Sequence, residues 1–145
     1  MPLSPTGPDL SFFSDPPADV AGTAEAWATA MGSYMDDLFF VSTTVATAQS
    51  ALQTSLELSL DGATDAATAF DAAMLTFAGA VGLGMSGGGF AGLPPTGPFS
   101  GMVFLGGEYD DAAVASAAIA LEIYDWFITG TATLAVAPFT VYSWS

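Results

Sequence analysis

Residues 18 to 40 read ADVAGTAEAWATAMGSYMDDLFF, and this stretch has the clearest periodic pattern in the chain. Its apolar residues recur at alternating intervals of four and three, which places them along one stripe of an α-helix. Pro16-Pro17, which directly precede this stretch, favour a helix start there, with Ser14 or Asp15 as possible caps. The stripe is bulky enough to be buried and predicts a core helix; it consists of Val20, Ala24, Trp27, Met31, Tyr34 and Leu38.

Three further segments have helical spacing. Residues 42–60 favour a helix, although the alternation of residues 56–60 is also compatible with a strand. A third helix is predicted from near Thr64 to the glycines before Met85, and a fourth over residues 110–129. These patterns predict a mainly α protein with about four helices in a small antiparallel bundle.

The remaining segments are predicted to be extended. We expect an N-terminal arm at residues 1–16, a helical domain at 17–130, and an extended or strand-like C-terminal arm at 131–145. Within the domain, residues 86–107 are rich in glycine and proline and form a long loop, which could contain a short strand at 101–105. If both arms dock onto neighbouring subunits, they should be mobile in the free protein and ordered in an assembly.

The charge balance restricts the partners. The chain of 145 residues has 15 Asp and Glu residues and no Lys, Arg or His, which gives a formal net charge of −15. Since no basic side chain can neutralise phosphates, nucleic acid and anionic membrane surfaces are excluded as partners. A hydrophobic content of 52% supports a folded core. We expect the protein partners to have basic surfaces and the chain to work in a homo- or hetero-oligomeric assembly.

The same absences argue against catalysis. Without cysteine or histidine, the chain has no thiolate, no Ser-His-Asp arrangement and no imidazole ligand, and without lysine it has no phosphate-loop lysine. Asp36 and Asp37 are neighbours on a helix and point in different directions, so they do not face one substrate together. Asp61, Asp65 and Asp71 flank the third helix without a protease motif. We therefore expect no enzyme activity and no cofactor.

Two other readings stay open. Glu108, Asp110 and Asp111 are clustered and could hold Ca²⁺ through oxygen ligands, although they lack the spacing of an EF-hand. Residues 72–93 carry no charge over the length of a bilayer span, so a membrane-associated protein is an alternative. Glycines in that stretch and the lack of basic flanks favour a buried helix followed by a loop.

Aromatic residues in the arms and the loop are the candidate contacts with neighbouring subunits. Exposed apolar side chains in extended segments are typical of docking peptides. The candidates are Phe12, Phe13, Phe90, Phe99, Phe104, Tyr142 and Trp144.

Several stretches resemble small structural proteins of tailed bacteriophage virions. They are the proline-rich start, Glu25-Ala-Trp-Ala28, Phe77–Met85, Leu93–Pro98, and Asp125–Ala132 followed by the final Trp144-Ser145. The resemblance implies a virion component of the tail, baseplate or head, present in the host cytoplasm during assembly and without catalytic residues. The lack of basic residues departs from what we expect of such proteins.

Overall fold

A computed structural model of the chain describes residues 3–38, 42–62, 65–97, 99 and 109–145. Within these residues it contains four α-helices and a small three-stranded sheet, so the mainly helical class is confirmed. Residues 56–60 belong to a helix and not to a strand. The elements are η1 (Ser11–Phe13), α1 (Val20–Asp36), α2 (Val45–Leu60), α3 (Ala66–Gly84), η2 (Met85–Gly88), β1 (Phe90–Leu93), α4 (Ala112–Phe127), β2 (Thr131–Leu134) and β3 (Val141–Ser143).

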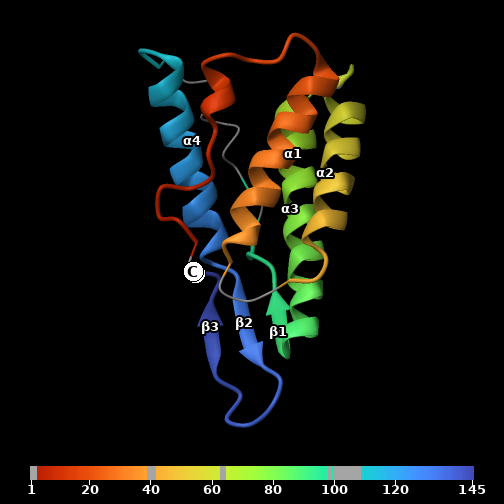
Figure 1. Cartoon of the computed structure of the whole chain (residues 1–145), viewed down its shortest axis with the longest axis vertical. Helices are drawn as coiled ribbons and strands as arrows, with labels where there is room; N and C mark the ends of the chain where they lie inside the picture. Colours follow the sequence, from red (N-terminus) through yellow and green to blue (C-terminus); the bar gives the residue numbers. More distant parts are fainter. Residues whose placement is uncertain (1–2, 39–41, 63–64, 98, 100–108) are drawn as a thin grey trace.

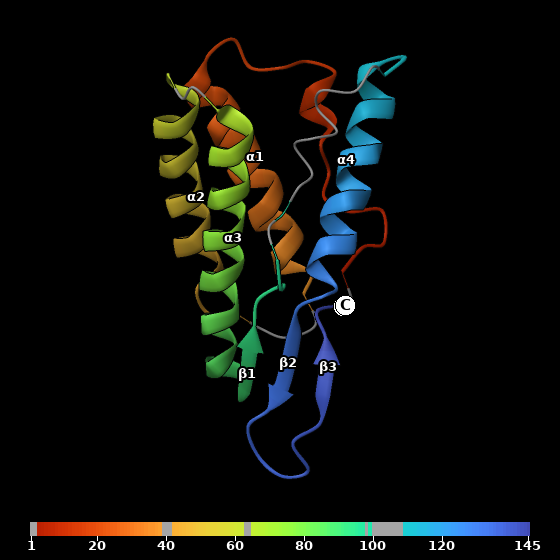
Figure 2. The ribbon, with the colours of Figure 1, turned by 180° about the vertical axis from the view of Figure 1, so that it is seen from behind.

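The helices do not form a regular antiparallel bundle. Helices α1, α2 and α3 lie together and alternate in direction, whereas α4 lies across from them and runs in the same direction as α3 (Figures 1 and 2). The predicted antiparallel arrangement is therefore correct for the first three helices and wrong for the fourth. The reason is β1, which follows α3 and runs back along it, so the chain has already reversed before α4 begins.

Aspartates cap the three helices that begin at the same end of the molecule. Each carboxylate accepts a hydrogen bond from the backbone N–H three residues later, which satisfies one of the free donors of the first turn. Helix α1 thus starts at Asp19 and not at the predicted Ser14 or Asp15. The bonds are Asp19 with Gly22 (2.7 Å), Asp65 with Thr68 (3.1 Å) and Asp111 with Val114 (2.8 Å).

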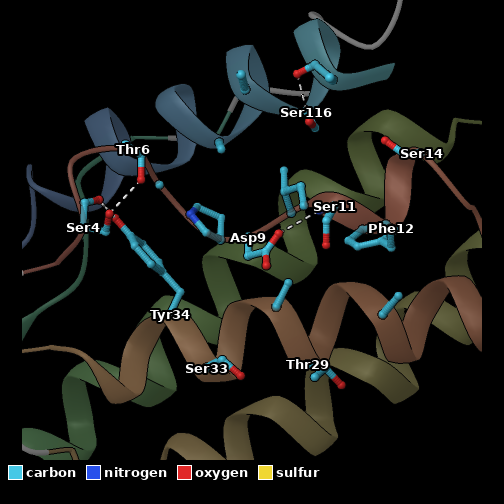
Figure 3. A pocket seen from close by; sticks show the side chains of 18 of the residues that line it. Ser4, Thr6, Asp9, Ser11, Phe12, Ser14, Thr29, Ser33, Tyr34 and Ser116 are labelled. Atoms are coloured by element: carbon cyan, nitrogen blue, oxygen red, sulfur yellow. Dashed lines mark hydrogen bonds between the residues drawn. The ribbon is translucent and has the colours of Figure 1, made fainter. Parts of the chain in front are cut away.

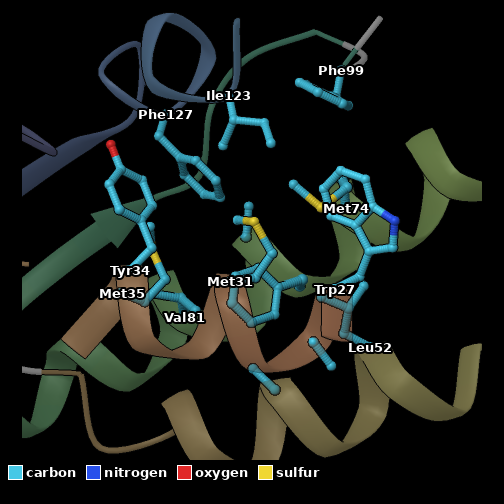
Figure 4. Close-up of a cluster of buried hydrophobic side chains, with 14 of the residues drawn as sticks. Trp27, Met31, Tyr34, Met35, Leu52, Met74, Val81, Phe99, Ile123 and Phe127 are labelled. Carbon is cyan, nitrogen blue, oxygen red and sulfur yellow. The ribbon is translucent and has the colours of Figure 1, made fainter. Parts of the chain in front are cut away.

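The stripe predicted from residues 18–40 forms the centre of the core. Every member except Val20 is buried. The Trp27 ring of α1 packs edge-on against Phe70 of α3, with ring centroids 4.7 Å apart. Phe77 of α3 lies 6.5 Å from Phe127 of α4, again edge to face. Large aromatic side chains thus span the space between α4 and the other helices, with Met31 between them (Figure 4).

The sheet closes one end of the molecule. Strands β2 and β3 form a hairpin joined by residues 135–140, and β1 pairs antiparallel on the other side of β2. The register places Ala132, which is fully buried, between Gly92 and Tyr142. Strands β2 and β3 lie within residues 131–145, for which an extended or strand-like arm is predicted. The first part of the predicted 86–107 loop forms η2 and β1, while the suggested strand at 101–105 lies outside the described residues.

The described part of the predicted N-terminal arm packs against the molecule. Leu3 and Leu10 are buried, and the Tyr34 hydroxyl donates a hydrogen bond of 3.0 Å to the Ser4 carbonyl. Gly7 has a φ of +77° and touches α4 so closely that a Cβ would overlap the main chain of Ala120. Residues 3–16 therefore lie on the chain's own helices in this structure (Figure 1).

Candidate functional site

The seven aromatic residues predicted to contact neighbours are in different environments. Phe99 and Trp144 are buried in the chain's own core, so neither side chain offers a surface to a partner in this fold. Phe12 and Phe13 are half-buried and pack against Trp27, with ring centroids 5.4 and 5.6 Å away. The other two described aromatics, Phe90 and Tyr142, lie on the sheet with centroids 6.3 Å apart. Phe104 is outside the described residues.

Trp144 is held by specific contacts. Its indole Nε1–H donates a hydrogen bond of 2.9 Å to the Thr131 carbonyl, and its ring stacks on Phe127 at a centroid distance of 6.2 Å. A Cβ on Gly130 would approach the ring atoms to 2.8 Å, and one on Gly82 to 3.1 Å. The two glycines thus make room for the indole between α3 and the start of β2.

The predicted acidic cluster is not assembled as a metal site in the part of the chain that the structure describes. Glu108 is outside that part, and Asp110 is exposed. The carboxylate of Asp111 already accepts the Val114 N–H as the cap of α4. The described residues contain no group of three or more acidic side chains placed to hold a metal ion.

An open groove of about 1170 Å³ lies between the N-terminal segment, α1 and α4 (Figure 3). Its walls carry many hydroxyl groups and alanines, and its acidic members are Asp9, Glu25 and Asp37. Burial, with a smaller contribution from Tyr124, raises the pKa of Tyr34 far above its usual range, so its hydroxyl stays protonated and donates to Ser4. The groove can accept hydrogen bonds from cationic or hydroxyl-bearing groups.

The opposite ends of the molecule differ in charge. We define the acidic end as the end where α1, α3 and α4 begin and α2 terminates, at the top of Figure 1. We define the sheet end as residues 75–93 and 131–143, which comprise the second half of α3, η2, the three strands and the 135–140 turn. The sheet end has no charged residue. The acidic end contains Asp15, Asp19, Asp61, Asp65, Asp110 and Asp111.

Exposed apolar side chains gather at the sheet end. The turn between β2 and β3 projects beyond the helices in both views of the ribbon (Figures 1 and 2). Phe139 is 61% exposed at this tip and has a φ of +53°, a left-handed conformation that a bulky residue rarely adopts. Exposed apolar residues of this kind mark interaction surfaces. The large ones here are Leu75, Leu83, Leu93, Val136, Phe139, Val141 and Tyr142.

Within the described part of the chain, one helix passes a length and composition test for crossing a membrane. Residues Ala67–Gly88 have a mean hydropathy of 1.3, and half of the apolar window is buried inside the protein. Phe70, Phe77 and Val81 of this helix face the core. A core helix of a folded domain passes the same test, so the finding is weak support for the membrane alternative.

Comparisons with protein-family models, with curated proteins and with solved structures find no match to this chain.

Proposed function

We propose that the protein is a non-enzymatic structural assembly protein that docks onto neighbouring subunits through its sheet end. The observation that carries the proposal is the separation of charge and apolar surface along the molecule. The acidic groups lie outside the sheet end, and the projecting tip presents Val136 and Phe139. Docking a charge-free apolar surface removes hydrophobic area from water without burying an unpaired charge.

The backbone of the tip supports this assignment. A left-handed conformation costs a non-glycine residue about 1–2 kcal/mol, and glycine or asparagine would occupy it more readily. Phe139 takes this conformation and yet leaves most of its ring exposed, so the chain gains little internal packing in return. Exposed strained residues are typical of sites that act on something outside the chain.

A virion is the assembly that we propose, consistent with the resemblance to tailed-phage structural proteins. The protein would then form part of the tail, baseplate or head and would be in the host cytoplasm during assembly. Neighbours with basic surfaces would suit the acidic end and the groove, because the net charge of −15 provides long-range attraction. The membrane reading has less support, since the apolar helix contributes Phe70, Phe77 and Val81 to the core.

Site-specific photocrosslinking in the native source tests the proposal. A photoreactive phenylalanine analogue at Phe139 should give a discrete adduct with a neighbouring subunit, recovered with the large assembly in a density gradient. The same analogue at Leu58, which is 76% exposed on α2, is the matched control and should give little adduct. Peptides must be produced with a protease that cuts at acidic or aromatic residues, because the chain has no trypsin site. A protein that sediments alone, with no adduct at Phe139, would overturn the proposal.

A further inference from the structure

The groove between the N-terminal segment, α1 and α4 is built by segments that are fixed to one another. The N-terminal segment lies between the two helices in Figure 3 and is attached to both of them. On the α1 side, the Tyr34 hydroxyl donates a hydrogen bond of 3.0 Å to the Ser4 carbonyl. On the α4 side, Gly7 lies so close to the main chain of Ala120 that no Cβ would fit between them. A groove held in this way is formed before a partner binds, which reduces the entropic cost of binding.

Three carboxylates line this groove at successive levels along α1. Glu25 and Asp37 are twelve residues apart in the sequence, which corresponds to about 18 Å along a helix axis. Asp9 of the N-terminal segment lies between the levels of Thr29 and Ser33 in Figure 3, and thus between the two outer acids. A metal ion holds its oxygen ligands at about 2.0–2.6 Å, so one ion cannot bridge carboxylates at this spacing. The spacing suits positive charges that are distributed along an elongated partner.

The positive charges that face this groove have to come from another molecule. None of the 145 residues is Lys, Arg or His, and this count covers the whole sequence. No side chain of the protein itself can therefore pair with Asp9, Glu25 or Asp37. The formal net charge of −15 also attracts a cationic partner from a distance.

The rest of the lining suits the backbone of such a partner. Ala113, Ala117 and Ala120 of α4 recur at intervals of four and three, so their short side chains let another chain approach the helix closely. The groove also contains hydroxyl groups, for example those of Ser33 and Ser116, which can both donate and accept hydrogen bonds. An extended segment has backbone N–H and C=O groups that need such partners, whereas a folded surface has already paired most of its own.

We infer that the groove binds an extended segment of a neighbouring subunit with a Lys or Arg at every third residue. In a polyproline II conformation every third side chain lies on the same edge, and six residues span about 19 Å at 3.1 Å each. Three basic side chains at this interval therefore match the levels of Glu25, Asp9 and Asp37. The inference rests on the proposed assembly function for the source of the segment, and it adds a charged docking site to the apolar sheet end.

A synthetic peptide tests the spacing directly. The probe is the dye-labelled heptapeptide Lys-Pro-Ala-Lys-Pro-Ala-Lys, and fluorescence anisotropy measures its binding to the full-length protein. A control peptide of the same composition, Pro-Ala-Lys-Lys-Lys-Pro-Ala, has the same charge but places its lysines together. We expect the control to bind at least about fivefold more weakly. Equal affinities would mean that the protein attracts any cation of this charge, and the inference would be wrong.

Variants that remove one charge locate the binding site. Asp37→Asn and Glu25→Gln keep the size of the side chain and should each weaken binding of the heptapeptide by about fivefold or more. Asp36→Asn is the matched control for the first variant, because Asp36 is adjacent and exposed but does not line the groove. Glu57→Gln on α2 is the control for the second. Both controls should change the affinity by less than about twofold, and equal losses in variants and controls would overturn the inference.

A change of shape without a change of charge gives an independent measurement. Ala117→Phe would fill part of the groove and should weaken binding by about fivefold or more. Val114→Phe adds the same ring on α4 at a position that is 47% exposed and outside the lining, and it should have little effect. Circular dichroism identifies any variant that fails to fold. If Ala117→Phe bound the peptide as tightly as the unchanged protein, the peptide would not lie in the groove.

Two further outcomes separate this inference from its alternatives. If spermine, a linear polyamine without a backbone, bound as tightly as the heptapeptide and responded equally to Ala117→Phe, the occupant would be a small cation and not a protein segment. A photoreactive phenylalanine analogue at Ser33, an exposed residue of the groove, should give an adduct with a Lys- or Arg-containing segment in the native source. If no adduct formed at Ser33 while the Phe139 adduct persisted, the groove inference would be wrong and the proposed assembly function would stand.

Discussion

The acidic end and the sheet end of this protein are stabilised by different interactions. At the acidic end, helices α1, α3 and α4 all begin, and the partial positive charges of their N-termini face the carboxylates of Asp19, Asp65 and Asp111. At the sheet end, contacts depend on close packing of glycines and aromatic rings without any charge. In a chain without basic residues, the helix N-termini supply the partial positive charges that these carboxylates face.

The largest expected effect comes from a variant that removes packing next to the sheet end and leaves every charge unchanged. Trp144→Ala should lower the free energy of unfolding by about 3–5 kcal/mol, because the buried indole leaves a cavity and an unpaired Thr131 carbonyl. Tyr142→Ala, two residues earlier and partly exposed, is the control and should cost much less. Urea denaturation at several salt concentrations measures both, and the loss for Trp144→Ala should not vary with salt. A small loss would mean that the indole is not part of the core.

A smaller loss is expected when the same packing is made too tight. Gly130→Ala would place a Cβ 2.8 Å from the Trp144 ring and should lower the free energy of unfolding by about 1–3 kcal/mol. Thermal unfolding followed by near-ultraviolet circular dichroism reports both stability and the environment of the tryptophan. Gly79→Ala is the control, because a Cβ at Gly79 would meet open space. Gly62 is unsuitable, since its φ of +107° would strain an alanine. Equal losses at positions 130 and 79 would contradict the close contact.

At the acidic end, the loss of stability on replacing a capping aspartate should depend on its hydrogen bond and its charge. Asp111→Ala should cost about 1 kcal/mol by removing the α4 cap, whereas Asp111→Asn should retain most of the stability because asparagine also caps helices. Denaturant unfolding compares the two variants. If asparagine were as destabilising as alanine, the charge and not the hydrogen bond would be the main contribution.

Added salt should affect the interactions of the acidic end and leave the packing of the uncharged sheet end unchanged. The acidic groups repel one another, and screening lengths shorten from roughly 10 Å at 0.1 M to 3 Å at 1 M ionic strength. Added salt should therefore leave the melting temperature of the isolated protein unchanged or raise it, while the affinity for a basic partner falls. A chloride series, measured by calorimetry, provides the test. A clear decrease in melting temperature with salt would disprove net repulsion as the dominant charge effect.

The smallest expected effect is a pH dependence at one cap. Hydrogen bonds from the Thr68 hydroxyl and backbone lower the pKa of Asp65 in the folded protein. A lowered folded-state pKa stabilises the fold at pH values above the unfolded-state value, near 3.9, and this contribution is lost as pH falls through the folded-state pKa. Thr68→Val should reduce the slope of stability in that acidic range. NMR titration of the Asp65 carboxyl, which should move towards its ordinary value in the variant, checks the cause.

The helices could be predicted from the sequence because each depends on local periodicity. The stripe from Ala24 to Leu38 is buried as predicted, and all four helices lie close to their predicted ranges. The pairing of the sheet could not be predicted, because β1 pairs with a strand about forty residues away. The close approach of Gly92 to Gly82, which lets β1 pack on α3, also has no sequence signature. The direction of α4 follows from the same strand.

The candidate site was only partly predictable for a related reason. Phe99, Trp144 and Phe139 are all large aromatic residues outside the predicted helices, and the sequence does not distinguish the two that become buried from the one that stays exposed. The lack of charge over residues 126–145 was visible, but its meaning depends on the fold placing that segment beside residues 75–93. The exposed tip is therefore a property of the tertiary structure.

The uncharged sheet end also determines how the molecule turns as it diffuses. Its centre of negative charge lies away from its geometric centre, towards the acidic end. Near any negatively charged body, the electric field then exerts a torque that rotates the acidic end outwards and presents the tip first. Repulsion, which slows the approach, would thereby reduce the fraction of collisions that occur in unproductive orientations. For such a molecule, repulsion from a like-charged body would select the orientation of approach, in addition to the long-range attraction that a basic neighbour exerts.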